Sequence, residues 1–323
     1  MLRHGIKGDR STGKGGTGSA VLLSHGGPVL QGEAPYLIFW TPSNHPIASS
    51  SESLLERYLT DTSADSALGS TSNVFSVLTQ YGAPYSQTFS TANQAIVDSN
   101  PYPAQQTGCA LATGMTACVT DASLQAEISR LIAAGTVPLR AAGSTPIFFM
   151  ITPVDVNVCT GGNVCSSNDF CAYHSYFSNG GQDVLYASVP FSVFANGNTK
   201  GCQTDQYKNY ETPAGPFAGD EAYNVADDLS HEFSETATDP LINAWYSKQG
   251  LEVGDLCEAY ASTANTNKGL SPLAYAPAYG DATAGTLYDQ IINGDEYYNQ
   301  TEYSNTDGQC MTGETALPIP PTQ

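Results

Sequence analysis

The segment from Ser230 to Pro240 restricts the fold of this chain more than any other, because it combines an amphipathic helix with a cluster of ionisable side chains. We expect a helix that starts near Asp220 and ends before Pro240, since a proline disfavours helical geometry at the residue before it. One side of this helix is apolar over roughly 100° of arc. The apolar residues are Ala222, Val225, Ala226, Leu229 and Phe233. This stripe predicts that the helix packs against a hydrophobic core.

The opposite side of the same helix carries a pattern typical of metal sites. His231 and Glu235 are four residues apart, so they project from one face, one turn apart, and Glu232 lies beside them. The spacing is that of a zincin helix with a carboxylate in place of the second histidine. Such a set could bind a metal ion and activate water. The alternative is the solvated, acidic face of an ordinary amphipathic helix, which is the commoner outcome for an isolated match.

A metal centre needs a third protein ligand, and the sequence offers carboxylates shortly after the helix. The segment from Glu252 to Cys257 follows a turn at 248–250, so Asp255 or Glu252 could fold back over the helix, with Cys257 fixing the segment through a disulfide. One histidine and two carboxylates neutralise Zn²⁺, so the centre lowers the pKa of water less than a two-histidine site does. The same oxygen-rich set also suits Ca²⁺, which would make the site structural.

Other constellations are weaker. His174 follows Cys171 closely, and we interpret it as a hydrogen-bonded structural histidine. His25 is expected in a turn, although it could line a cleft. A glycosidase pair of carboxylates is compatible with so acidic a chain, but no particular pair stands out.

The eight cysteines indicate up to four disulfides, because such a number is unusual in a reducing compartment. We expect Cys109 and Cys118 to close a small loop. Three further cysteines cluster in sequence, and three remain for longer bridges: Cys159, Cys165 and Cys171, then Cys202, Cys257 and Cys310. A cysteine zinc site is the alternative, but the sequence contains no C-x-x-C pair.

Charge and hydropathy exclude several classes of function. The chain has 31 acidic and 11 basic residues, a net charge of −20, which repels phosphate backbones and argues against nucleic-acid binding. No stretch approaches the ~20 apolar residues of a membrane span. Residues 1–20 lack the apolar core of a signal peptide, so we infer an extracellular location from the cysteines alone.

The order of predicted elements indicates a single α/β (α+β) domain with a mixed sheet and packed helices. We expect strands at 21–23, 36–40, 147–151 and 184–189, and helices around 54–59, 74–81 and 120–135. The cysteine-rich stretch between the last two strands is predicted to be a loop. We divide the chain into a flexible Gly-rich segment at 1–19, a domain at 20–312 with a loop-rich, disulfide-bonded periphery, and a Pro-rich tail at 313–323.

Taken in order, several segments together resemble the phosphate-induced or exordium-like family of secreted proteins. The matching segments are 25–30, 36–40, 124–128, 147–155, 170–174, 230–240, 243–246 and 252–257. They span about residues 20–260, most of the chain. The resemblance implies an extracellular, disulfide-bonded domain with a zincin-like fold, in which His231 and Glu235 are ligands and Glu232 is the base. This chain departs from the usual zincin pattern at Glu235.

Two functional hypotheses follow. The first is a secreted metal-dependent hydrolase, a zinc peptidase in which His231, Glu235 and Asp255 or Glu252 hold Zn²⁺ and Glu232 is the catalytic base. The second is a non-catalytic extracellular module, associated with a cell surface or wall or self-assembling, in which the site is structural with Ca²⁺ or vestigial. Plant exordium-like proteins often lack the His–Glu pair and are linked to growth and the cell wall, which is compatible with the second hypothesis.

Overall fold

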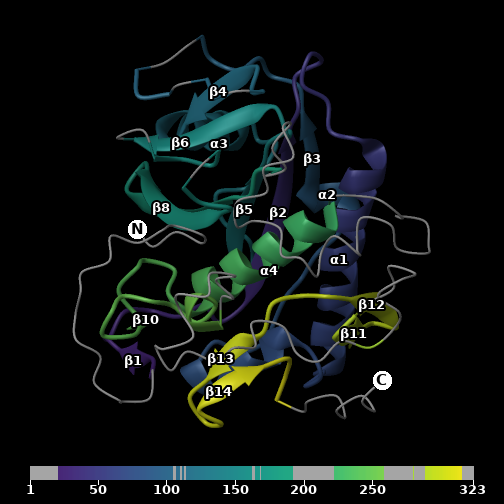
Figure 1. The fold of residues 1–323 in the computed structure, drawn as a ribbon, viewed down its shortest axis with the longest axis vertical. Helices are drawn as coiled ribbons and strands as arrows, with labels where there is room; N and C mark the ends of the chain where they lie inside the picture. The colour runs from purple at the N-terminus through teal and green to yellow at the C-terminus, as the bar shows by residue number, and fades with distance from the viewer. Residues whose placement is uncertain are drawn as a thin grey trace.

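A five-stranded mixed sheet forms the centre of the protein in this computed structural model (Figure 1). Its strand order is β3-β2-β5-β9-β8, in which β8 is an antiparallel edge strand and the other neighbours are parallel. The strands are β2 (Glu33–Trp40), β3 (Ala95–Asp98), β5 (Thr145–Ile151), β8 (Tyr173–Asn179) and β9 (Gln182–Ser188). The structure describes residues 21–104, 107–109, 111–112, 114–161, 164–167, 169–191, 222–257, 279 and 288–314.

The sheet is buried on both faces because side chains of one strand alternate between two cores. In β2, Leu37 and Phe39 belong to the core shared with the helices α1 (Ser49–Leu68) and α4 (Ala222–Thr238). The intervening Ile38 and Trp40 belong to the core on the opposite face, under α3 (Asp121–Ala133). A continuously apolar strand is therefore what this central position requires.

Shorter elements surround this layered centre. They are the helices η1 (Val74–Tyr81), α2 (Thr91–Gln94) and η3 (Asp255–Cys257), and the small sheets β4 (Ala117–Thr120) with β6 (Val156–Gly161) and β7 (Val164–Cys165), β1 (Leu23–Ser24) with β10 (Trp245–Tyr246), β11 (Gln290–Ile292) with β12 (Asp295–Tyr297), and β13 (Glu302–Ser304) with β14 (Gln309–Met311).

Most of the expected elements are present. The α3 helix begins after Thr120, whose side chain accepts a hydrogen bond from the Ser123 backbone N–H, and its C-terminal turn is followed by Gly135 at a φ of 71°. The helix expected around 74–81 is a 3-10 helix. The predicted loop between β5 and β9 is wrong, because that stretch contains β6, β7 and β8. Strand β8 was missed because its outer half alternates between intermediate and exposed positions and carries little apolar pattern.

Disulfides hold the periphery, as expected. Cys109–Cys118 closes the predicted small loop, Cys159–Cys165 joins β6 to β7, and Cys257–Cys310 joins η3 to β14. Cys171 is also disulfide-bonded. A cysteine zinc site is excluded for Cys109, Cys118 and Cys159, whose sulfur atoms lie close together, because all three are already oxidised.

Several predictions fall on residues outside those described. They are the flexible segment at 1–19, the pairing of Cys202, the helix start near Asp220, most of the Pro-rich tail at 313–323, and the first part of the loop-rich region after residue 259. The described end of that region forms the hairpins β11–β12 and β13–β14 against the core. None of the helices among the described residues is long and apolar enough to cross a membrane.

Candidate metal centre

Helix α4 places the predicted motif inside the protein. Its apolar stripe packs into the core shared with the sheet and α1, as the sequence predicts. The opposite side is also covered: His231, Glu232 and Glu235 each have 0% exposed surface. The alternative prediction, that this acidic face of the helix is solvated, is therefore wrong. Burial of several ionisable groups on one helix is costly unless they bind one another or a cation.

The first half of the site contains His231 and Glu235, with Asp255 from η3. The His231 Nε2 atom lies 3.1 Å from Glu235 Oε1 and 3.9 Å from Asp255 Oδ1. The Asp255 backbone N–H donates to Glu235 Oε1 at 3.1 Å, which ties the η3 segment to α4. The chain thus folds back over the helix as the carboxylates after the turn suggested, and Cys257, bonded to Cys310, holds the end of that segment.

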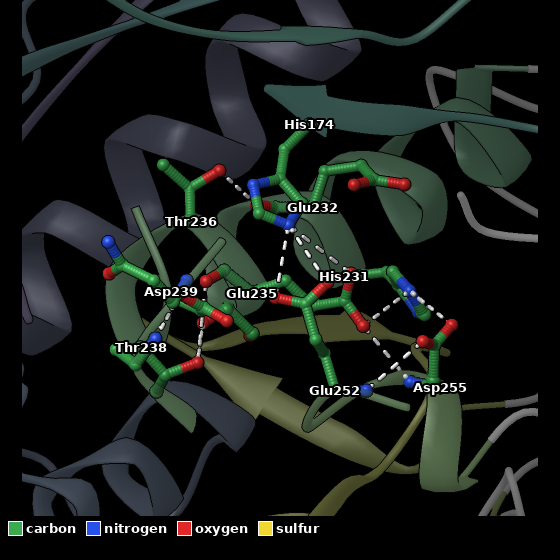
Figure 2. A network of polar contacts seen from close by, with 12 residues as sticks. His174, His231, Glu232, Glu235, Thr236, Thr238, Asp239, Glu252 and Asp255 are labelled. Atoms are coloured by element: carbon green, nitrogen blue, oxygen red, sulfur yellow. Dashed lines mark hydrogen bonds and ion pairs between the residues drawn. The ribbon is translucent and has the colours of Figure 1, made fainter. Parts of the chain in front are cut away.

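The second half contains His174, which sequence reasoning had treated as a structural histidine beside a disulfide. This residue lies in the edge strand β8, and its Nε2 atom is 3.2 Å from Glu252 Oε2 and 3.8 Å from Glu235 Oε2. Figure 2 shows the His174 ring directed at these carboxylates from above, with His231 to their right. His174 is hydrogen-bonded, as expected, and its partner is Glu252, while Glu235 lies 3.8 Å away. The sequence did not predict that His174 lies beside two candidate ligands.

Both Glu252 and Asp255 contact the motif, although the sequence offered them as alternatives. The Glu252 backbone N–H donates to Asp255 Oδ2 at 3.1 Å, so the two carboxylates are fixed relative to one another. Asp239, which flanks the motif, closes the turn after the helix, where its Oδ1 atom accepts from the Asn243 and Ala244 N–H groups, and its side chain is also hydrogen-bonded to Glu252. His25 is exposed and stacks on Tyr246, with ring centroids 3.6 Å apart.

Burial sets the protonation of the cluster before any cation binds. Desolvation raises the pKa of Glu252 well above its ordinary value, and the nearby carboxylates of Glu235 and Asp255 raise it further. Desolvation, with a smaller contribution from His231, lowers the pKa of His174 to about 3. At neutral pH the imidazole of His174 is therefore neutral and can donate a lone pair. A cation that binds here displaces the proton from Glu252.

The surroundings of His231 fix which of its nitrogen atoms faces the carboxylates. Gln300 donates from Nε2 to the Gly254 carbonyl at 2.6 Å, so its Oε1 atom is the one that faces His231 Nδ1, at 3.3 Å. We therefore assign the proton to Nδ1, which leaves the lone pair of Nε2 directed at Glu235 and Asp255. A hydrogen bond to the second ring nitrogen is the usual support of a metal-binding histidine.

The donor atoms fit a divalent cation. Around Zn²⁺, bonds of about 2.0–2.1 Å at tetrahedral angles place neighbouring ligand atoms roughly 3.3 Å apart. Two sets of three residues each offer one donor atom within 4.8 Å of the others: His231, Glu235 and Asp255, and His174, Glu232 and Glu235. The mixture of imidazole and carboxylate is compatible with Zn²⁺, whereas the large share of oxygen is compatible with Ca²⁺.

Comparisons with known proteins add no evidence about this site. No family model matches the chain, and neither a curated protein nor a solved structure matches it. The resemblance to the exordium-like family therefore stays a prediction from sequence motifs.

Proposed function

We propose that this protein is a secreted metal-dependent hydrolase, most simply a peptidase, whose cation is held by His231, Glu235 and Asp255. The observation that carries the proposal is the convergence of one donor atom from each of these residues, two from one helix and one from η3. A divalent cation bound there would polarise a substrate carbonyl and lower the pKa of water.

Glu232 is the residue we assign as general base. It precedes Phe233 of the apolar stripe and follows His231 directly, so the helix holds it next to the ligand set. One of its carboxylate oxygens lies within 4.8 Å of donor atoms of Glu235 and His174. From this place it would accept a proton from an attacking water molecule and pass the proton to the leaving amine.

The experiment combines metal analysis with a single substitution. Purified protein is analysed for bound Zn²⁺ and Ca²⁺, and the wild type and Glu232→Gln are then compared on a broad peptide library. We expect bound Zn²⁺ in both proteins and a loss of cleavage of at least 10²-fold in the variant, the usual contribution of a general base. Glu33→Gln, at a buried glutamate at the start of β2, is the matched control. Equal cleavage by the wild type and Glu232→Gln would rule out this role.

A second candidate function has one specific observation in its favour, which is the depth of the site. Asp255 is the most exposed residue of the site, at 7%. The other five are at 0%: His174, His231, Glu232, Glu235 and Glu252. A structural cation takes all its ligands from the protein, whereas a catalytic one needs an open position. A non-catalytic extracellular module with structural Ca²⁺ would contain that ion, melt at a lower temperature after chelation and cleave no peptide.

An extracellular location and its partners belong to the same proposal. The described disulfides are consistent with an oxidising compartment. The strong negative charge favours neutral or basic peptides or cell-wall polymers over nucleic acid, and self-association is compatible with the second candidate. Refolding yield with and without a thiol oxidant tests the compartment, because a cytosolic protein would not need the oxidant.

A further inference from the structure

We propose that the site holds two divalent cations, with Glu235 as the carboxylate that bridges them. The first position is that of the proposed function, on which this inference rests. The second is held by His174 and Glu252 together with the other oxygen of Glu235. The first position combines two residues of the helix motif with Asp255 of η3, and the second arises where strand β8 and the segment before η3 meet helix α4.

The two oxygens of Glu235 serve different histidines. The Oε1 atom is 3.1 Å from His231 Nε2, and the Oε2 atom is 3.8 Å from His174 Nε2. Figure 2 shows the His174 ring above the Glu235 carboxylate and the His231 ring to its right, so the two rings reach it from different directions. A carboxylate that presents one oxygen to each of two nitrogen donors has the arrangement of a bridging ligand in a two-metal site, where the ions lie about 3.5–4 Å apart.

The second position has enough donors of its own. His174 Nε2 is 3.2 Å from Glu252 Oε2 and 3.3 Å from Glu252 Oε1, so the imidazole faces the whole carboxylate. Glu232, the general base of the proposed function, has an oxygen within 4.8 Å of donor atoms of His174 and Glu235 and so lies beside this position. Both His174 and Glu252 are completely buried, and the spacing from His174 Nε2 to the Glu252 oxygens is close to that expected between two ligands of one cation.

Charge favours two cations over one. The carboxylates of the cluster are Glu232, Glu235, Glu252 and Asp255, and the buried carboxyl of Asp239 is hydrogen-bonded to Glu252. Four charges of −1 with two neutral imidazoles sum to −4, so one divalent cation leaves −2 and two leave zero, or −3 and −1 where Asp239 is also ionised. Residual charge in a buried site is costly. The described arginines that form ion pairs do so elsewhere in the fold, in the pairs Arg57–Asp61 and Arg130–Asp98.

The alternative is a single cation beside a hydrogen-bonded pair, in which a protonated Glu252 donates to His174. The two possibilities differ in stoichiometry, which can be measured without any substrate. The full chain is stripped with a chelator, equilibrated with Co²⁺ or Zn²⁺ and dialysed, and bound metal is counted per chain. We expect two ions in the wild type, one in His174→Ala, and two in the control His45→Ala, whose ring is paired with Asp155 at 2.8 Å.

A second measurement keeps the inference testable if His174→Ala does not fold. Co²⁺ is titrated into the wild-type protein and followed by electron paramagnetic resonance, where carboxylate-bridged ions couple magnetically. Loss of signal per ion between one and two equivalents supports the bridge. Saturation of the wild type at one Co²⁺ per chain overturns the two-cation site, and loss of that one ion in His231→Ala leaves the proposed function standing. No bound metal in the wild type overturns both.

Discussion

Gly254 is the residue through which the geometry of the site can be tested without touching a ligand. A Cβ atom built on Gly254 would lie 2.6 Å from both Nδ1 and Cε1 of His231. Ordinary contacts between such atoms are about 3.5 Å. The backbone of Gly254 is outside the left-handed region, so alanine itself is not strained there and the effect of Gly254→Ala is purely steric.

The expected magnitude follows from the mismatch. Relief of the clash requires the ring or the η3 segment to move by roughly 0.9 Å, the difference between the two distances, whereas metal ligands tolerate about 0.2 Å. The movement would also break the contact of Nδ1 with Gln300. We expect cation affinity to fall by at least 10-fold, about 1.4 kcal/mol, and the metal-free protein to lose about 1–3 kcal/mol of its free energy of unfolding through overpacking.

Two assays check this prediction. Isothermal titration with Zn²⁺ gives the affinity, and urea unfolding of the metal-free protein gives the stability. In a His231→Ala background the same glycine substitution should cost nearly nothing in stability, because the ring it meets is absent. Unchanged Zn²⁺ affinity in Gly254→Ala, or an equal stability cost in both backgrounds, would show that His231 does not lie against Gly254 as described.

Three further predictions concern the supports of the site and the sheet. Gln300→Leu removes the acceptor at His231 Nδ1 and should weaken Zn²⁺ binding about 10-fold by titration calorimetry; full affinity would show that the tautomer needs no such support. The double change Cys257→Ser with Cys310→Ser breaks a disulfide between residues separated by 53 positions, and should lower the free energy of unfolding by about 4 kcal/mol and weaken Zn²⁺ binding. Loss of Cys109–Cys118, separated by 9 positions, should lower the free energy of unfolding by about 3 kcal/mol and leave Zn²⁺ affinity unchanged. Equal effects of the two changes on Zn²⁺ affinity would contradict the role given to η3. Burial raises the pKa of Glu33 to about 8 from an unfolded value of 4.5, so the folded state keeps a proton that the unfolded state loses, and stability falls as pH rises between these values. From pH 4.5 to 7 this loss is on the order of 3 kcal/mol, and urea unfolding of wild type and Glu33→Gln should diverge by that amount; parallel pH profiles would refute it.

Much of the fold could be predicted from local patterns. Helix α3 is predicted by its capping threonine and its apolar stripe, and strand β5 is predicted by an uninterrupted apolar run. Both patterns arise from neighbours along the chain, which is why a single sequence reveals them. The same holds for α4, where helical spacing alone places His231 and Glu235 one turn apart.

Contacts between residues far apart in the sequence could not be predicted from such local patterns. Strand β8 has no continuous apolar run, because as an edge strand it is half solvated beyond its first three residues. Its identity depends on pairing with β9, a contact that no local signal encodes. With β8 unrecognised, His174 had no place near the motif, and the sequence offered only its nearness to Cys171.

The sequence by itself determined which candidate donor groups helix α4 presents and supplied Glu252 and Asp255 as alternatives. Only the tertiary structure decided that both carboxylates reach the helix, that His174 joins them from β8, and that all six side chains are buried. The physical reason is that donor types and their spacing on one helix are local properties, whereas the gathering of α4, β8 and η3 around one point depends on how the sheet and core pack.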